Sequence, residues 1–260
     1  MGLLGGLFKK AKHKGYFEIE ISSISRLTNN AVKVAFDIPE KLSEKFNYAP
    51  GQYINILAEI GGKEERRSYS ICSAKDEKLA IGIKSVKNGI VSNWFNLEAQ
   101  EGTKLFISEP QGNFKIPSGA KHVANIAAGS GITPILSILK SKSNVEGMHL
   151  LYGNRSKEET MFLEEIKQMN NIKTSYFFDT NHDENAISGR IDKDNLVKFI
   201  KNDLTFLKND AFLICGPEEM ILTCIEALEF FGVAKNKIIY ELFTTPISLG
   251  VEEQEESYAL

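Results

Sequence analysis

The hydrophobic pattern of this 260-residue chain changes its period near residue 117. Before that point, apolar side chains recur at every second position in short runs, as at Phe17, Ile19 and Ile21. After it, short unbroken apolar runs alternate with longer segments in which apolar side chains recur every three or four residues. A period of two indicates strands with one buried face, and a period near 3.6 indicates amphipathic helices. We therefore expect two domains of different architecture.

The first domain is expected to span residues 15–117 and to consist mainly of β-strands. Further alternating runs lie at residues 32–36 and 79–83, and turn-forming residues such as Pro50 and Gly51 separate the runs. Many short strands with little helix between them predict an antiparallel sandwich or barrel.

The second domain is expected to span residues 118–246 and to alternate strands with helices. The expected strands cover residues 122–128, 148–152, 172–178, 211–215 and 238–243. The expected helices cover residues 132–139, 158–169, 192–200 and 221–228. Such alternation predicts βαβ units and a parallel sheet. We interpret the flanking segments, residues 1–14 and 247–260, as a flexible basic N-terminus and an acidic linker or tail.

The composition argues against several functional classes. A formal net charge of −3 gives no general attraction to nucleic acid. No apolar run approaches the ~20 residues of a membrane span. The histidines are scattered, and the three cysteines, Cys72, Cys215 and Cys224, form neither a disulfide framework nor a metal-binding cluster. We therefore expect no metal site, and we expect a reducing, cytoplasmic compartment.

The run from Arg67 to Ser70 carries the first chemical signal. On a strand, Arg67 and Tyr69 share one face, and Ser70 lies beside them at the strand end. A cation for a phosphate, a ring for stacking and a small hydrogen-bonding group are what a flavin nucleotide requires. The alternative is a strand with an ordinary polar surface.

Two glycine-containing turns predict anion sites at helix N-termini. Gly89 precedes an apparent helix over residues 93–97, with Ser92 at or near its N-cap. In the second domain, the run Gly129 to Thr133 joins a buried strand to a helix, which is the context of a phosphate-binding turn. The alternative for this second site is a plain tight turn.

Two further strand ends carry candidate nucleotide ligands. Arg155 and Ser156 follow the second strand and suit a 2′-phosphate better than a carboxylate would, which favours NADPH over NADH. The alternative for Arg155 is a solvated loop residue. Cys215, followed by Gly216 and Pro217, puts a thiol at the ligand-binding edge of the sheet, although a buried cysteine can simply act as a small hydrophobe.

Together these motifs resemble the ferredoxin–NADP⁺ reductase superfamily. The matching motifs, in order, are Arg67-x-Tyr69-Ser70, Gly89-x-x-Ser92, Gly129-x-Gly131-x-x-Pro134, Cys215-Gly216-Pro217-x-x-Met220 and Glu241-Leu242-Phe243. The longer strings, residues 66–73 and 240–246, are similar to the reductase subunits of phenylacetyl-CoA epoxidase and related oxygenases. The resemblance implies an antiparallel Greek-key β-barrel that binds FAD, followed by a Rossmann-like parallel α/β domain that binds NAD(P).

The resemblance also implies residue roles. Arg67 would pair with the FAD pyrophosphate, Tyr69 would stack on the flavin ring, and Ser70, Cys215 and Glu241 would be catalytic. The full set of expected cofactor-binding residues is Arg67, Ser68, Tyr69, Ser70, Ile83, Lys84, Gly89, Val91, Ser92, Gly129, Gly131, Thr133, Arg155, Ser156, Cys215, Gly216, Pro217 and Met220.

The implied electron route leads from NADPH or NADH through FAD to an iron–sulfur domain or ferredoxin, and then to an oxygenase component. The relatives carry a C-terminal [2Fe–2S] domain with four cysteines, which these 260 residues lack. We expect either a natural two-domain reductase or, slightly favoured, a fragment of a longer protein. The alternatives are a free flavin or ferric reductase, and a non-catalytic flavin-bearing regulatory subunit.

Overall fold

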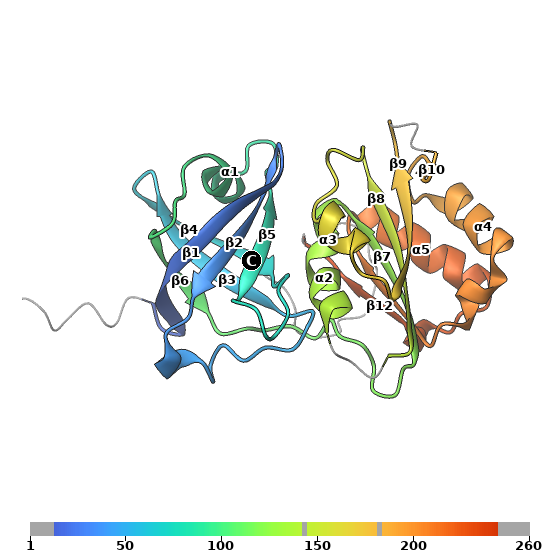
Figure 1. The fold of residues 1–260 in the computed structure, drawn as a ribbon, viewed down its shortest axis with the longest axis horizontal. Coiled ribbons are helices and arrows are strands. Elements are labelled where there is room, and N and C mark those ends of the chain that lie inside the picture. Colours follow the sequence, from blue (N-terminus) through green and yellow to red (C-terminus); the bar gives the residue numbers. More distant parts are fainter. Residues whose placement is uncertain (1–12, 142–144, 181–183, 244–260) are drawn as a thin grey trace, which may run out of the picture.

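The computed structural model describes residues 13–141, 145–180 and 184–243, which form two domains side by side (Figure 1). Each domain is built on its own six-stranded sheet. The expected N-terminal arm, apart from its last two residues, and the expected acidic tail lie outside these ranges.

The first domain is an antiparallel sheet that curls into a barrel, as the alternating pattern predicted. Its strands are β1 (Tyr16–Thr28), β2 (Ala31–Asp37), β3 (Tyr53–Ile60), β4 (Lys63–Ser70), β5 (Ala80–Lys84) and β6 (Lys104–Ser108). They are ordered β4-β3-β6-β1-β2-β5. A bridge between Ile71 and Ile81 brings the two edge strands together. The short helices of this domain are η1 (Glu40–Leu42) and α1 (Ile90–Leu97), and α1 inserts Val91 and Phe95 into the barrel core.

The second domain is a parallel sheet with helices on both faces. Its strands are β7 (His122–Ala128), β8 (Gly147–Asn154), β9 (Ile172–Phe178), β10 (Ile187–Ser188), β11 (Ala211–Cys215) and β12 (Ile238–Glu241). They are ordered β10-β9-β8-β7-β11-β12, and every pairing is parallel. Its helices are η2 (Gly129–Gly131), α2 (Ile132–Lys140), α3 (Leu163–Lys167), α4 (Lys193–Asn202), η3 (Leu204–Lys208), α5 (Glu218–Phe230) and η4 (Lys235–Lys237). The prediction of a parallel α/β domain is confirmed.

Helices α2 and α3 lie on the face of the parallel sheet that meets the barrel, and α4 and α5 cover the opposite face (Figure 1). Buried side chains of α2, such as Ile135 and Leu139, share one core cluster with Ala31, Ala35 and Ala80 of the barrel. Strands β2 and β5 are therefore buried on both faces, whereas their alternating pattern predicted only one. Small residues on the second face allow this close approach.

Polar contacts also join α2 to the barrel. The Ser137 hydroxyl donates to the Ser73 carbonyl oxygen at 2.8 Å, and both residues are fully buried. The Lys140 ammonium lies 3.0 Å from a carboxylate oxygen of Glu77 in the barrel, and it also contacts Glu165. These contacts hold the C-terminal half of α2 against the barrel.

The helix expected over residues 158–169 is much shorter, because α3 covers only Leu163–Lys167. Phe162, just before it, has a left-handed backbone with φ of 59°. Both Met161 and Phe162 are buried against Gly82 of the barrel. The chain therefore turns at Phe162, where Met161 and Phe162 pack against the barrel, and α3 begins only after this turn.

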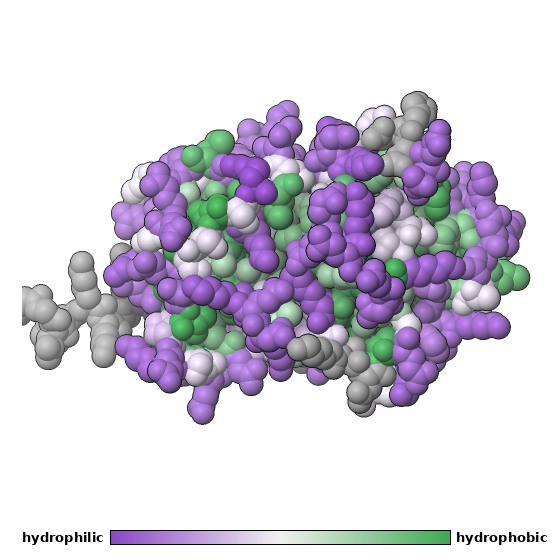
Figure 2. Space-filling model, viewed as in Figure 1, coloured by the Kyte–Doolittle hydropathy of each residue, from purple (hydrophilic) through white to green (hydrophobic). Residues whose placement is uncertain are grey.

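The visible surface is mostly hydrophilic, with scattered apolar patches (Figure 2). Within residues 13–141, 145–180 and 184–243, no helix is both long and apolar enough to cross a membrane.

Candidate active site at the domain junction

The three expected catalytic residues come from two domains and meet at their junction. Ser70 ends β4 of the barrel, while Cys215 and Glu241 end the neighbouring strands β11 and β12 and lie opposite each other in register. The Ser70 hydroxyl lies near the Glu241 carboxyl group and lowers its pKa. The structure thus brings Ser70 together with two residues that are 145 and 171 positions away in the chain.

Glu241 has an unusual electrostatic environment. Burial raises the pKa of its carboxyl group from 4.5 to about 8, and the nearby Ser70 hydroxyl offsets part of that shift. Its Oε2 atom is buried and has no hydrogen-bond partner among the described residues. At neutral pH the carboxyl group is therefore mostly protonated, and it has unused hydrogen-bonding capacity at the junction.

Two neighbours of Glu241 lie in the same poorly solvated environment. Burial, followed by the Glu241 charge, raises the pKa of the Cys215 thiol well above 9.0, so this thiol is neutral. Burial and Glu241 also raise the pKa of Tyr53, at the start of β3. Sequence reasoning missed Tyr53, although its pairing with Ser70 follows from the register of two adjacent strands.

Arg67 and Tyr69 share one face of β4, as the strand period predicted. They lie opposite Ile56 and Ile54 of β3 in the register of the sheet. The Tyr69 ring meets the Phe95 ring of α1 edge-on, with centroids 6.1 Å apart. The Arg67 side chain is 53% exposed and has only a 3.4 Å contact with Glu65 as an ion pair, so its guanidinium group can reach an anion.

The N-terminus of α1 offers amide donors beside this strand. The helix begins at Ile90 after an N-cap at Gly89, and no side chain caps it. Ser92 is therefore inside the first turn, and the prediction that it lies at or near the N-cap of a helix over residues 93–97 was wrong. Its hydroxyl oxygen accepts a hydrogen bond from the Val86 amide at 3.3 Å. The uncapped amides and the helix dipole can bind a phosphate.

Two glycine-containing turns pack backbone against backbone at the carboxyl edge of the parallel sheet. A Cβ atom on Gly131 would lie 2.1 Å from the Cys215 carbonyl oxygen, so no larger residue fits. A Cβ atom on Gly216 would lie 2.7 Å from the Met220 side chain. Gly131 is the N-cap of α2, and no side chain caps this helix either. The turn expected to bind a phosphate and the turn that carries the thiol thus occupy one edge.

Arg155 and Ser156 follow β8 and contact carboxylates. The Ser156 hydroxyl donates to Glu158 at 2.7 Å, and the Arg155 guanidinium lies 3.9 Å from Glu159. Glu159 also lies 3.4 Å from the Lys84 ammonium of the barrel. Arg155 remains 68% exposed, so this cluster retains a cation that can meet a nucleotide phosphate.

Several expected cofactor residues direct their side chains elsewhere. The side chains of Ile83 and Val91 pack in the barrel core, so only their backbones can face a cofactor. The Ser68 hydroxyl donates to Asn55 at 2.6 Å. The Thr133 hydroxyl donates to the Ser130 carbonyl oxygen at 2.9 Å, and its methyl group faces Gly82.

Asn154 is a polar residue that sequence reasoning missed. It ends β8, is only 9% exposed, and both polar atoms of its side chain lack a geometric hydrogen-bond partner within the described ranges. Its position one residue before Arg155 was the available signal. A buried amide at the ligand-binding edge of the sheet has capacity to bind a nucleotide.

Comparison with known proteins assigns both domains. Residues 18–116 match the oxidoreductase FAD-binding domain, and residues 126–225 match the oxidoreductase NAD-binding domain. One subunit of the 1,2-phenylacetyl-CoA epoxidase from Escherichia coli is 30% identical over 247 residues, which cover 89% of this chain and 68% of the relative. The chain belongs to the ferredoxin–NADP⁺ reductase family.

Members of this family are NAD(P)H-dependent flavin oxidoreductases, and the expectation of such an enzyme is confirmed. The ferredoxin reductase component of 3-ketosteroid-9-alpha-monooxygenase from Mycobacterium tuberculosis is 29% identical, over 87% of this chain and 65% of the relative. The chain thus spans about two thirds of the length of these curated relatives. A Neisseria gonorrhoeae ferredoxin NADP⁺ reductase with bound FAD and NADP has the same fold, with a TM-score of 0.77, 20% identity, and coverage of 89% and 100% of the two chains.

The residues at the junction fit a flavin dinucleotide on structural grounds. An exposed guanidinium group and an uncapped helix N-terminus are suited to a pyrophosphate, and Tyr69 offers a ring for stacking. The orphaned Oε2 atom of Glu241 marks a buried polar position that a ligand can satisfy.

Proposed function

We propose that this reductase takes hydride from NAD(P)H onto FAD and passes single electrons to an iron–sulfur acceptor that serves an oxygenase. The observation that carries the proposal is that Ser70 of the barrel meets Glu241 and Cys215 of the α/β domain at the domain junction. FAD supplies the exchange between hydride transfer and single-electron transfer when it is bound. The chain itself supplies binding, orientation and the protons.

The barrel residues bind and orient the flavin in this proposal. Arg67 pairs with its pyrophosphate, together with the first amides of α1 at Val91 and Ser92. Tyr69 stacks on the ring system and Ser70 donates a hydrogen bond near it. The half-buried Tyr69 is already held by Phe95, so little side-chain freedom is lost on binding.

The α/β residues position the pyridine nucleotide in this proposal. Gly131 and Gly216 let the backbone approach the pyrophosphate and the nicotinamide, and the neutral Cys215 thiol gives a small apolar contact that keeps water away. With a pKa of about 8, Glu241 holds a proton on its carboxyl group at neutral pH and can share it with Ser70.

We assign NADPH as the preferred reductant because of Arg155 and Ser156. The guanidinium group can turn from Glu159, at 3.9 Å, to a 2′-phosphate. The variant Arg155→Gln should lose at least about tenfold in kcat/KM for NADPH and little for NADH, since one charge-assisted hydrogen bond contributes about 1.5–3 kcal/mol. Equal losses for both nucleotides would contradict the assignment.

The decisive experiment is anaerobic reduction of the purified yellow protein. NADPH should bleach the flavin, and a flavin that no pyridine nucleotide reduces would support the non-catalytic alternative. Arg67→Ala should purify with much less flavin. Its neighbour Arg66→Ala is the matched control, because Arg66 points to the other face of β4, 5.7 Å from the Tyr16 ring. Equal flavin content in the two variants would refute the role of Arg67.

The acceptor is proposed from the names of the relatives, a phenylacetyl-CoA epoxidase subunit and a monooxygenase reductase component. Single turnover with a [2Fe–2S] ferredoxin should reduce its cluster faster than free flavin or ferric chelates are reduced. The reverse order would favour the free flavin or ferric reductase. A reducing, cytoplasmic location is supported by the buried free thiols of Cys72, Cys215 and Cys224.

A further inference from the structure

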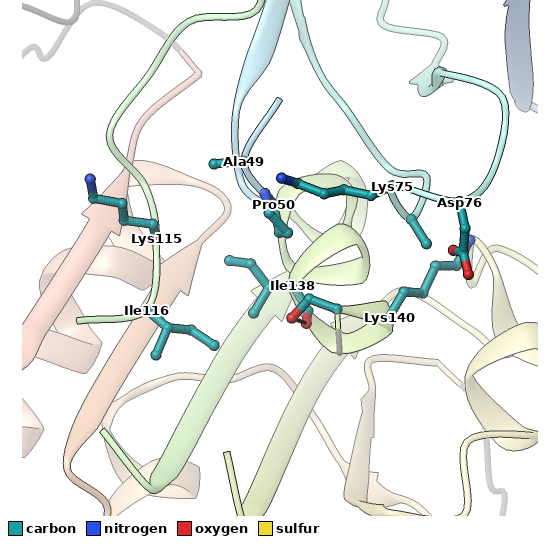
Figure 3. A pocket seen from close by; sticks show the side chains of 10 residues that line it. Ala49, Pro50, Lys75, Asp76, Lys115, Ile116, Ile138 and Lys140 are labelled. Atoms are coloured by element: carbon teal, nitrogen blue, oxygen red, sulfur yellow. Dashed lines mark hydrogen bonds between the residues drawn. The ribbon is translucent and has the colours of Figure 1, made fainter. Parts of the chain in front are cut away.

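A cavity opens between the two domains, at the C-terminal end of α2 (Figure 3). Its volume is about 510 Å³. The residues that line it are Ala49, Pro50, Ala74, Lys75, Asp76, Lys115, Ile116, Ile138, Lys140 and Ser141. The barrel, the segment between the two sheets and α2 all contribute to its walls.

This cavity is distinct from the junction site. The N-cap of α2, Gly131, contacts the Cys215 turn, whereas the cavity lies at the other end of the helix, around Ile138 and Lys140. Because α2 spans nine residues with a rise of about 1.5 Å each, the two ends are about 12 Å apart. None of the residues lining the cavity belongs to the set expected to bind FAD or NAD(P).

The cavity combines an apolar floor with unpaired positive charge. Figure 3 shows Lys75 and Lys115 on opposite sides, with Ile138 below and between them and Ile116 below Lys115. Neither lysine has an ion-pair partner among the residues that the structure describes. Lys140 differs, because its ammonium group contacts two carboxylates, Glu77 and Glu165.

Asp76 is the single carboxylate among the residues that line this cavity. It lies on the side of Lys140, away from Lys115 (Figure 3). Lys75, Lys115 and Lys140 balance Asp76, Glu77 and Glu165 in number, but the carboxylates gather around Lys140. The unpaired positive charge therefore lies at Lys75 and Lys115. An uncharged ligand would leave both ammonium groups unused, and an inorganic anion would leave the apolar floor in contact with water.

We propose that this cavity binds a small organic carboxylate with an aromatic or acyl body. The body packs on Pro50, Ile116 and Ile138, and the carboxylate lies between the ammonium groups of Lys75 and Lys115. The volume is in the range of about 300–1,000 Å³ that is typical of small-molecule sites. Because both domains line the cavity, the bound acid links them and stabilises their assembled form.

The test uses the FAD-loaded protein and titration calorimetry with octanoate, with octan-1-ol as the uncharged probe. Native protein should bind octanoate more tightly than octanol, and octanoate should raise the midpoint of thermal unfolding. The double variant Lys75→Gln/Lys115→Gln should lose about tenfold or more in octanoate affinity and keep its octanol affinity, since only the carboxylate makes charge-assisted hydrogen bonds with the two ammonium groups. Both side chains are exposed, so the fold should be unaffected.

The matched control is Lys78→Gln/Lys104→Gln, which changes the net charge equally at two exposed ion pairs outside the cavity. It should bind octanoate as native protein does. A second variant, Ala49→Trp, should fill the cavity and abolish binding of both probes. The proposal is overturned if native protein does not bind octanoate, if the two double variants bind it equally, or if NADP⁺ displaces it competitively.

Discussion

Glu241 is the residue whose titration should be visible in the stability of the whole chain. Its carboxyl pKa is about 8 in the folded protein against 4.5 as the reference value, so the folded state holds a proton that the unfolded state has released between these pH values. Stability must then fall as pH rises through this window. Replacement by glutamine removes the effect.

The expected measurement is the free energy of unfolding in urea for native protein and Glu241→Gln at several pH values. The difference, variant minus native, should increase by up to about 1.4 kcal/mol per pH unit from pH ~5 to ~8 and then level off. Parallel curves would show that the carboxyl group has an ordinary pKa.

Gly131 should not tolerate a methyl group. A Cβ atom there would meet the Cys215 carbonyl oxygen at 2.1 Å, so Gly131→Ala must push the two turns apart at a cost of about 1–3 kcal/mol. Thermal unfolding should report the destabilisation, and equilibrium titration should show weaker NADP⁺ binding. Ser130→Ala is the control, because the Thr133 hydroxyl bonds only to the Ser130 backbone. Unchanged NADP⁺ affinity in Gly131→Ala would contradict the role of this turn.

Sequence motifs predicted that Ser70, Cys215 and Glu241 belong to the site, but they did not predict every residue that lies beside these three. Strand ends at one sheet edge could be inferred from βαβ order. Tyr53 could not, since its approach to Glu241 depends on how the barrel meets the second domain. The start of α1 was predicted three residues too late, at residue 93, because the helix begins at Ile90 without a capping side chain. Ser92 therefore lies inside the helix and not at its N-cap.

At the scale of one element, α2 is held to the barrel by a charge that is almost fully buried. The Lys140 side chain is 7% exposed and contacts Glu77 and Glu165, which keep 41% and 33% exposure. Lys140→Met keeps the aliphatic stem but leaves two carboxylates unmatched. We expect a loss of about 1–3 kcal/mol in unfolding free energy, less than for a fully buried pair because water still reaches both carboxylates.

Urea denaturation of Lys140→Met measures this loss, and Lys78→Met is its control. Lys78 pairs with Asp37 at the surface, where both side chains are more than 60% exposed. Its replacement should cost less than about 1 kcal/mol. Equal effects of the two variants would show that the ion pairs of Lys140 contribute no more than a surface pair.

The hydrophobic periodicity correctly predicted strands and helices that are buried within their own domain. It gave wrong bounds where an element packs against the other domain. The strands over 122–128 and 211–215 were predicted to the residue, because their apolar runs are buried within one sheet. The helix over 158–169 was overestimated, since Met161 and Phe162 pack on Gly82 across the junction. No local pattern encodes that contact.

At the scale of the whole molecule, small residues of the barrel form its side of the interface between the two domains. Ala31, Ala35 and Ala80 are fully or almost fully buried on the outer faces of β2 and β5, positions that alternate with the apolar barrel residues. The alternation was visible in the sequence, but alanine is compatible with either exposure. The arrangement of two domains could therefore be predicted, while their extensive shared core could not.

This shared core should make the two domains unfold together. The single tryptophan, Trp94, lies in α1 of the barrel, whereas four of the five α-helices in the described part of the chain belong to the α/β domain. Tryptophan fluorescence therefore reports on one domain and far-ultraviolet circular dichroism mainly on the other. Because side chains of both domains form one cluster, we expect the two probes to give the same thermal midpoint.

A charge placed in the interface should separate the two transitions. Ala80 is fully buried between the domains, so Ala80→Asp would place an uncompensated carboxylate against α2. The barrel midpoint and the helix midpoint should then differ, with both below the native value. Ala234→Asp, at an exposed position, should retain a single midpoint. Two distinct midpoints in the native protein would instead mean that each domain is stable on its own, and that the buried contacts of α2 orient the domains without coupling their stability.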